Sequence, residues 1–194
     1  MRTYEEVRQA VLKKNYLFFE SGNYNINLIF ERTNDLITNY FTDFLHLCYK
    51  DDNGQPKILS ISATTKPGIN NCETFMLKPN QYRGSHYFTE GIANAQYPFS
   101  CPHFRQRLPL QCFPVKNNIV NKEIIIQDSA MHTHIHCMTK QDNQRIGNPI
   151  FTWSEECMGA EAVNFNKILP VIREAVKVYG INFTITILET IDFE

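Results

Sequence analysis

The chain has 194 residues, of which 43% are hydrophobic and 20% charged, and its formal net charge is −1 at pH 7. This length and composition predict a single globular domain with a substantial core. So small a net charge gives no electrostatic reason to expect nucleic acid or an anionic membrane as a partner. No apolar run is long enough to span a membrane, and the charged start at residues 1–6 lacks the apolar stretch of a signal peptide. We therefore expect the six cysteines, none in a Cys-x-x-Cys pair, to be reduced; their even number leaves a disulfide framework as the alternative.

The first third of the chain carries clear secondary-structure signals. Thr3 and Glu6 are spaced as a capping box, which predicts a helix over Thr3–Lys14. Alternating apolar residues predict strands over Tyr24–Glu31, Phe41–Lys50 and Lys57–Thr65. The turn-forming sequence Asp51-Asp52-Asn53-Gly54 predicts that the last two strands form a hairpin.

The middle of the chain, Ile69–Gln111, is rich in proline, glycine and aromatic residues and has no clear periodicity. We expect it to be irregular, and long irregular segments of compact domains are often binding regions. Further strands are expected over Leu110–Lys116, Glu123–Asp128 and Met131–Met138. A polar loop over Lys140–Pro149 follows.

The last part of the chain predicts a helix over Ala160–Tyr179, kinked or broken at Pro170, and a final strand over Ile181–Leu188. Strands and helices do not alternate regularly, so we expect an α+β fold that is mainly β. An antiparallel or mixed sheet would be flanked by two helices. Within this single domain, residues 1–20 would form a helix and connector, 23–163 a catalytic-like region, and 160–194 a helix and strand.

Two groups of residues are candidates for chemistry. His132, His134 and His136 would share one face of a strand, as zinc ligands, as a general base with polar neighbours, or as tolerated surface histidines. We expect no metal, because a well-placed fourth ligand is missing. About twenty residues later, Cys157 follows Ser154 at a predicted turn. A histidine near this thiol would give a Cys-His nucleophilic site, whereas a buried cysteine before a helix is the structural alternative.

Four motifs in a fixed order carry a family resemblance. They are Arg32-Thr33-Asn34, Thr64-Thr65-Lys66-Pro67-Gly68, Pro79-Asn80-Gln81-Tyr82-Arg83-Gly84, and Ile135-His136 followed by Trp153-Ser154-Glu155-Glu156-Cys157. In this order the chain resembles phage-encoded cell-wall hydrolase-like proteins related to the L,D-transpeptidase catalytic domain. The resemblance implies a β-rich fold that acts on the peptide stems of peptidoglycan, in the bacterial host cytoplasm after synthesis or attached to the virion, without a cofactor.

The resemblance also implies roles for individual residues. Cys157 would be the nucleophile, His136 its base, and Ser154 a support for the turn or the thiolate. Substrate-binding residues would be Arg83, which could bind a carboxylate in bidentate fashion, and the pocket-wall residues Tyr82, His86 and His134.

One residue departs from the family pattern. Glu156 stands directly before the cysteine, where the family has glycine. A carboxylate there would raise the pKa of the thiol and repel an oxyanion. The sequence therefore leaves open an impaired homologue that serves as a phage structural or cell-wall-binding module. A zinc-dependent hydrolase that uses the histidine strand is the third class.

Overall fold

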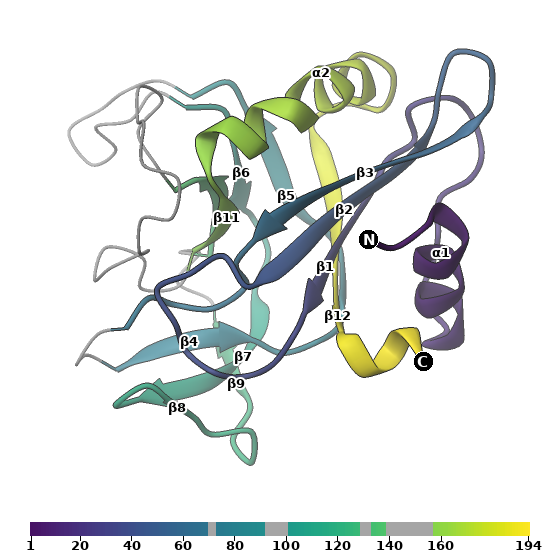
Figure 1. Ribbon diagram of the computed structural model, residues 1–194. Helices are drawn as coiled ribbons and strands as arrows, with labels where there is room; N and C mark the ends of the chain where they lie inside the picture. The colour runs from purple at the N-terminus through teal and green to yellow at the C-terminus, as the bar shows by residue number, and fades with distance from the viewer. Residues whose placement is uncertain (70–72, 92–100, 129–132, 139–156) are drawn as a thin grey trace.

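An eight-stranded mixed sheet forms most of the molecule (Figure 1). The structure is a computed structural model that describes residues 1–69, 73–91, 101–128, 133–138 and 157–194. In spatial order the strands are β11 (Met158–Ala160), β10 (Ile135–Cys137), β6 (His103–Gln106), β5 (Gln81–Thr89), β12 (Asn182–Glu189), β1 (Asn27–Arg32), β2 (Asp43–Lys50) and β3 (Pro56–Ala63). The β1–β12 and β10–β11 pairs are parallel, and the other neighbours are antiparallel.

The two edges of this sheet meet, so that the sheet is nearly closed. Thr64, directly after β3, forms an antiparallel bridge with Gly159 in the middle of β11. The Thr64 N–H donates to the Gly159 oxygen at 2.8 Å, and the Gly159 N–H donates back at 3.1 Å. Closure removes part of an exposed strand edge and brings the end of the β2–β3 hairpin beside β10 and β11.

The main core lies inside the curved sheet and is covered by α2 (Ala162–Tyr179), which crosses the top of Figure 1. Its buried residues, among them Phe165, Ile168 and Ile172, recur at helical spacing and pack into this core. The helix continues through Pro170 instead of breaking. Pro170 and Asn166, whose carbonyl loses its helical hydrogen bond, are both exposed, so water can satisfy that carbonyl.

The first helix, α1 (Tyr4–Lys13), covers the other face of the sheet. Its N-terminus has the predicted capping box between Thr3 and Glu6. Val7, Ala10 and Val11 pack with apolar residues of β1, β2 and β12 in a second, smaller core. Both ends of the chain lie near this helix (Figure 1), and the last turn of the chain is a 3-10 helix over Thr190–Phe193.

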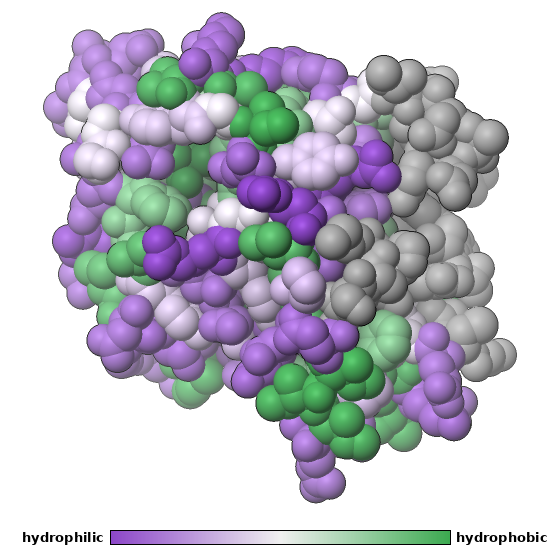
Figure 2. Space-filling model, turned by 180° about the vertical axis from the view of Figure 1, so that it is seen from behind, coloured by the Kyte–Doolittle hydropathy of each residue, from purple (hydrophilic) through white to green (hydrophobic). Residues whose placement is uncertain are grey.

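A second sheet lies at the lower end of the molecule in Figure 1. It consists of β4 (Thr74–Leu77), β7 (Leu110–Lys116), β8 (Ile119–Val120) and β9 (Ile126–Asp128). Figure 2, which shows the reverse side, has a largely hydrophilic surface with several hydrophobic groups, one of them at its lower end. The exposed isoleucines of this part of the chain are Ile119, Ile124 and Ile125.

The fold class is confirmed as mainly β with two helices and a mixed sheet. The prediction that Ile69–Gln111 is irregular is wrong, because this segment contains β4, β5 and β6. The strand expected over Glu123–Asp128 is confined to β9, and in the described part of Met131–Met138 only β10 is a strand. The expected loop over Lys140–Pro149 lies outside the described residues. In the described chain, no helix combines the length and apolar character needed to cross a membrane.

Candidate active site

The pairing of β10 with β11 sets the position of Cys157. The two strands run parallel, and His136 is the register partner of Gly159. The Met158 N–H donates to the His134 oxygen at 2.9 Å, which extends the pairing by one step toward the start of β11. Cys157, immediately before Met158, therefore stands beside His134 at the entrance to the strand.

The same pairing decides which face carries the reactive groups. Four residues of these two strands belong to the main core: Ile135, Cys137, Met158 and Ala160. Side chains alternate between the faces of a strand, so His134, His136 and Cys157 belong to the opposite face. The register partner of His136 on that face is Gly159, which has no side chain to separate the histidine from Cys157.

Gly159 is required by space rather than by backbone conformation. A Cβ built at this position would collide with the carbonyl oxygen of His136 and would lie 3.0 Å from Cγ of Met138. The backbone of β11 can therefore approach β10 and Thr64 closely only while this residue is glycine.

The hydrogen bonding of His136 suits a general base. Its Nδ1 lies 2.8 Å from the backbone oxygen of Cys137, and a carbonyl oxygen can only accept. Nδ1 therefore carries the hydrogen in the neutral ring, and Nε2 keeps the lone pair that accepts a proton.

His134 and His103 complete a group of histidines on this face. His103 of β6 is the register partner of His136, and its ring centroid lies 6.4 Å from that of His134. Burial, with Arg105 nearby, lowers the pKa of His134 to about 3, and burial also lowers the pKa of His103. His134 is therefore neutral at pH 7, and its Nδ1 accepts the Gln106 N–H at 3.3 Å. This positions His134 as a hydrogen-bonded neighbour rather than a charged partner of the thiol.

Cys157 differs from the other described cysteines in its exposure. It is partly exposed, whereas Cys48, Cys101, Cys112 and Cys137 are buried. Burial raises the pKa of Cys48 to about 12, which keeps that thiol inert. Of the cysteines that the structure describes, Cys157 is thus the one that a substrate in solution can reach.

Two of the sequence motifs meet in a buried polar network behind the Thr64 bridge. Asp43, fully buried, accepts from the Thr65 N–H at 2.8 Å and from the Thr65 hydroxyl at 2.7 Å. Its other oxygen lies 3.0 Å from Nζ of Lys66, which is also fully buried. Arg32 donates from Nε to the Thr65 hydroxyl at 2.8 Å, and Lys66 reaches the Asn34 backbone oxygen at 3.1 Å. The network ties Arg32-Thr33-Asn34 to the segment that closes the sheet against β11.

Tyr82 and His86 are structural, in contrast to their expected place in the pocket wall. The Tyr82 hydroxyl lies in the main core and donates to the backbone oxygens of Lys78 and Gln111 at 2.6 and 2.9 Å. His86 is fully buried, and its Nε2 donates to the Thr133 oxygen at 3.0 Å. Burial lowers the pKa of His86 to about 4, so this ring is a neutral support for the segment that leads into β10.

The structure does not bring Arg83 to the Cys-His pair. Arg83 is exposed on β5, six residues before Thr89, which is the residue that pairs with His103. At ~3.3 Å per residue it lies about 20 Å along the strand from the level of His103 and His136, and about 13 Å from the level of Tyr87, whose partner Arg105 is beside His134. Arg105 of β6 is the arginine whose charge is close enough to lower the pKa of His134 and His103. Ser154, Glu156 and His132 lie outside the described residues.

A pair of thiols next to His136 had no clear sequence signal. The Cys137 thiol donates a hydrogen bond to the sulfur of Cys101. This bond lowers the pKa of Cys101 against the opposing effect of burial and raises that of Cys137. The only hint in the sequence is the spacing of Cys101 and His103, two residues apart, which falls in the segment expected to be irregular.

No three histidine, cysteine, aspartate or glutamate side chains come together as a metal site in the described ranges. Comparisons with protein-family models, with curated protein sequences and with solved structures found no match to this chain.

Proposed function

We propose that this chain is a Cys-His hydrolase that cleaves the stem peptides of peptidoglycan, with Cys157 as nucleophile and His136 as general base. One observation carries the proposal: the parallel register of β10 and β11 sets the most accessible described cysteine beside two histidines on one face, with glycine between them. Thiol nucleophiles need a base within reach, and the chain supplies both from adjacent strands.

The chemistry follows the arrangement of these groups. Nε2 of His136 takes the thiol proton, and the thiolate attacks the peptide carbonyl to give a tetrahedral oxyanion. The protonated imidazole then gives its proton to the departing amine, which leaves an acyl-enzyme. A water molecule, deprotonated by the same nitrogen, hydrolyses the thioester and restores the thiol.

The substrate class rests on the order of the motifs and on charge. Stem peptides of peptidoglycan carry carboxylates, and Arg105 lies beside the histidines where it can attract one. We assign to Arg105 the carboxylate-binding role that the resemblance implied for Arg83. We further propose that the protein acts in the bacterial host or as part of a phage particle, as in the proteins that it resembles.

Glu156 supports a second candidate, a non-catalytic cell-wall-binding or phage structural module. Glu156 directly precedes Cys157 in the sequence, and a negative charge close to a thiol opposes thiolate formation. In this alternative the fold would bind peptidoglycan without cleaving it.

The deciding experiment incubates purified peptidoglycan with the natural protein and with the variants Cys157→Ala, His136→Gln and Glu156→Gly. Released muropeptides are resolved by mass. We expect release by the natural protein, none by Cys157→Ala, and faster release by Glu156→Gly. A sedimentation assay on the same material measures binding. Binding with background release from all four proteins would contradict the hydrolase and support the module.

A further inference from the structure

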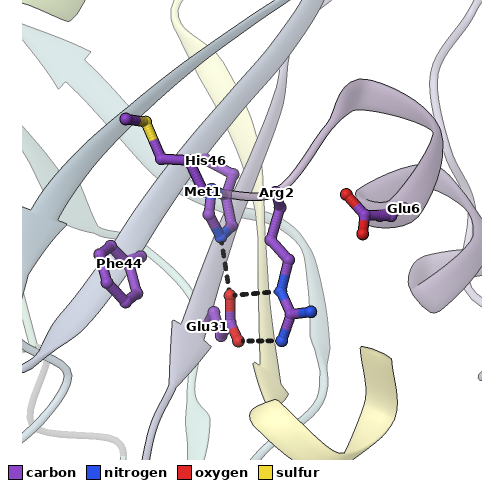
Figure 3. Close-up of a pocket in the computed structure, with 6 residues that line it drawn as sticks. All are labelled: Met1, Arg2, Glu6, Glu31, Phe44 and His46. Atoms are coloured by element: carbon purple, nitrogen blue, oxygen red, sulfur yellow. Dashed lines mark hydrogen bonds and ion pairs between the residues drawn. The ribbon is translucent and has the colours of Figure 1, made fainter. Parts of the chain in front are cut away.

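A second hydrogen-bonded relay lies on strands β1, β2 and β3, on the same outer face of the nearly closed sheet as Cys157. Three neighbouring strands each contribute one residue: Glu31 from β1, His46 from β2 and Ser60 from β3. Nδ1 of His46 lies 2.8 Å from the Ser60 hydroxyl, and Nε2 lies 3.0 Å from a carboxylate oxygen of Glu31. Figure 3 shows the second of these contacts.

The antiparallel register produces this alignment. His46 is directly opposite Ser60, while Glu31 is opposite Phe44, two residues away on β2 and therefore on the same face as His46. His46 on the middle strand therefore lies between the acid of β1 and the serine of β3 on one face of the sheet.

The two partners of His46 determine which of its ring nitrogens carries the hydrogen. The Glu31 carboxylate can only accept, so His46 donates from Nε2, and its Nδ1 is left to accept the Ser60 hydroxyl. Burial alone would raise the pKa of Glu31, but hydrogen bonds from His46 and Arg2 outweigh burial and hold that pKa at about 2. Glu31 is therefore ionised at neutral pH and can stabilise a protonated His46.

Additional contacts hold Glu31 in place. Arg2 binds both carboxylate oxygens, at 3.2 and 2.8 Å (Figure 3). Its guanidinium lies 4.5 Å from the ring centroid of Phe193. The Thr190 hydroxyl donates to Glu31 at 3.1 Å. Arg2 and Thr190 thus hold the acid of the relay in addition to its contact with His46.

The relay borders an open space. A cavity of about 280 Å³ is lined by Met1, Arg2, Glu6, Glu31, Phe44 and His46. Phe44 is 36% exposed and stacks near His46, with ring centroids 6.1 Å apart, so it offers an apolar wall. Ser60 is half-buried on β3, whereas His46 is almost fully buried. The cavity therefore lies on the acid side of His46, whereas the Ser60 hydroxyl is approached from the partly exposed outer surface of β3.

The edge position of β3 supplies a backbone donor. The Asp51 N–H bonds the Gln55 oxygen at the hairpin end, and hydrogen-bonded pairs alternate along an antiparallel ladder. Counting from that pair, His46 and Ser60 form a pair without backbone hydrogen bonds between them, so the N–H and C=O groups of Ser60 point away from β2. By the same alternation the Thr64 N–H points away from β2, and there it donates to the Gly159 oxygen. The Ser60 N–H therefore faces the outer edge of β3, near its own hydroxyl.

We propose that Ser60, His46 and Glu31 form a second nucleophilic site, which hydrolyses esters of small acyl groups. The Ser60 oxygen attacks the ester carbonyl as its proton passes to Nδ1 of His46, and Glu31 stabilises the imidazolium. The Ser60 N–H stabilises the oxyanion. The alkoxide leaves with the proton from His46, and water then hydrolyses the acyl-serine by the same route. This site needs neither Cys157 nor the function proposed for it.

The test uses the full chain carrying Cys157→Ala, which removes the accessible thiol. It is treated with a fluorophosphonate probe, which phosphonylates activated serines, and the modified residue is located by mass spectrometry of peptides. Hydrolysis of p-nitrophenyl acetate is followed in parallel. Ser62 is the internal control, because it lies on the same strand and face, is more exposed than Ser60, and is opposite Phe44 rather than a histidine.

We expect the probe on Ser60 and not on Ser62, and loss of ester hydrolysis in Ser60→Ala but not in Ser62→Ala. His46→Gln should slow hydrolysis by about 100-fold or more, the usual contribution of a general base. Circular dichroism verifies that each variant is folded, and Ser60→Ala is the smallest change. Equal labelling of both serines, absence of label on Ser60, or unchanged hydrolysis in Ser60→Ala would overturn the proposal.

Discussion

The buried pair of Asp43 and Lys66 gives the sharpest stability prediction. Both side chains are fully shielded from solvent, and their charged atoms are 3.0 Å apart. Asp43 also accepts three close hydrogen bonds from the backbone N–H groups of Thr33 and Thr65 and the Thr65 hydroxyl, at 2.7 to 3.1 Å. Asp43→Asn removes the anion, leaves the buried ammonium of Lys66 without its ion-pair partner and removes one of the carboxylates near the buried Arg32.

The expected cost follows from this burial. Breaking one side of a buried ion pair costs about 3–5 kcal/mol, because the remaining charge stays desolvated. Nη1 of Arg32 already has no hydrogen-bond partner among the described residues, so this site has little capacity to compensate. For a chain of this length each kcal/mol corresponds to ~2–4 °C, so the Tm of Asp43→Asn should fall by about 6–20 °C.

Urea denaturation of a double-mutant cycle measures this cost. Lys66→Met in the Asp43→Asn background removes the uncompensated ammonium, so the double variant should recover at least about 2 kcal/mol relative to the sum of the single changes. Glu73→Gln is the matched control: it breaks a pair of similar chemistry, Lys116–Glu73, whose side chains are 70% and 73% exposed. An exposed pair contributes about 0–1 kcal/mol. Equal losses in Asp43→Asn and Glu73→Gln, or strictly additive single effects, would refute the reasoning.

Three further predictions concern Gly159, the carboxylate of Glu31 and the thiols of Cys101 and Cys137. Gly159→Ala should lower the free energy of unfolding in urea by about 1–3 kcal/mol, because the added Cβ collides with the His136 carbonyl. A free energy of unfolding equal to that of the natural protein would contradict this. Since the pKa of Glu31 is lowered from 4.5 to about 2, its contribution is present above about pH 4.5 and is lost as the pH falls toward 2. The loss should reach up to about 3 kcal/mol, and it should be missing in Glu31→Gln when unfolding is measured at a series of pH values. Finally, the hydrogen-bonded thiols of Cys101 and Cys137 should form a disulfide with diamide, seen as a mass loss of about 2 Da that Cys101→Ser prevents; two titratable thiols after treatment would argue against their contact.

The elements that sequence reasoning found are those whose signals are local. The capping box of α1 joins residues three positions apart, and the turn at residues 51–54 joins β2 to β3. The amphipathic pattern of α2 and the alternation of β12 likewise extend over one segment each. Local patterns predict such elements because the interactions that stabilise them lie within the element or its nearest turn.

The segment Ile69–Gln111 was missed because its strands do not alternate cleanly. In β5, Ser85 and His86 are both buried, and Gly84 adopts a φ of +55° where the pairing with β12 shifts register. Three residues of β5, Arg83 to Ser85, here span the place of Thr184 alone on β12, which disrupts the period of two that marks a strand. Burial of a polar residue such as His86 is stabilised by distant groups, here the Thr133 oxygen, which no local pattern reveals.

Both candidate sites depend on strand register, so the sequence predicts only part of each. The turn at residues 51–54 already sets the pairing of the hairpin, so the contact of His46 with Ser60 follows from counting outward from that turn. Glu31 does not follow, because β1 meets β2 through a longer connection whose length leaves the register open. The pairing of β10 with β11 is harder still, since parallel neighbours have no tight turn to align them. A sequence can thus indicate which residue types are available for a relay, but the strand register decides which of them meet.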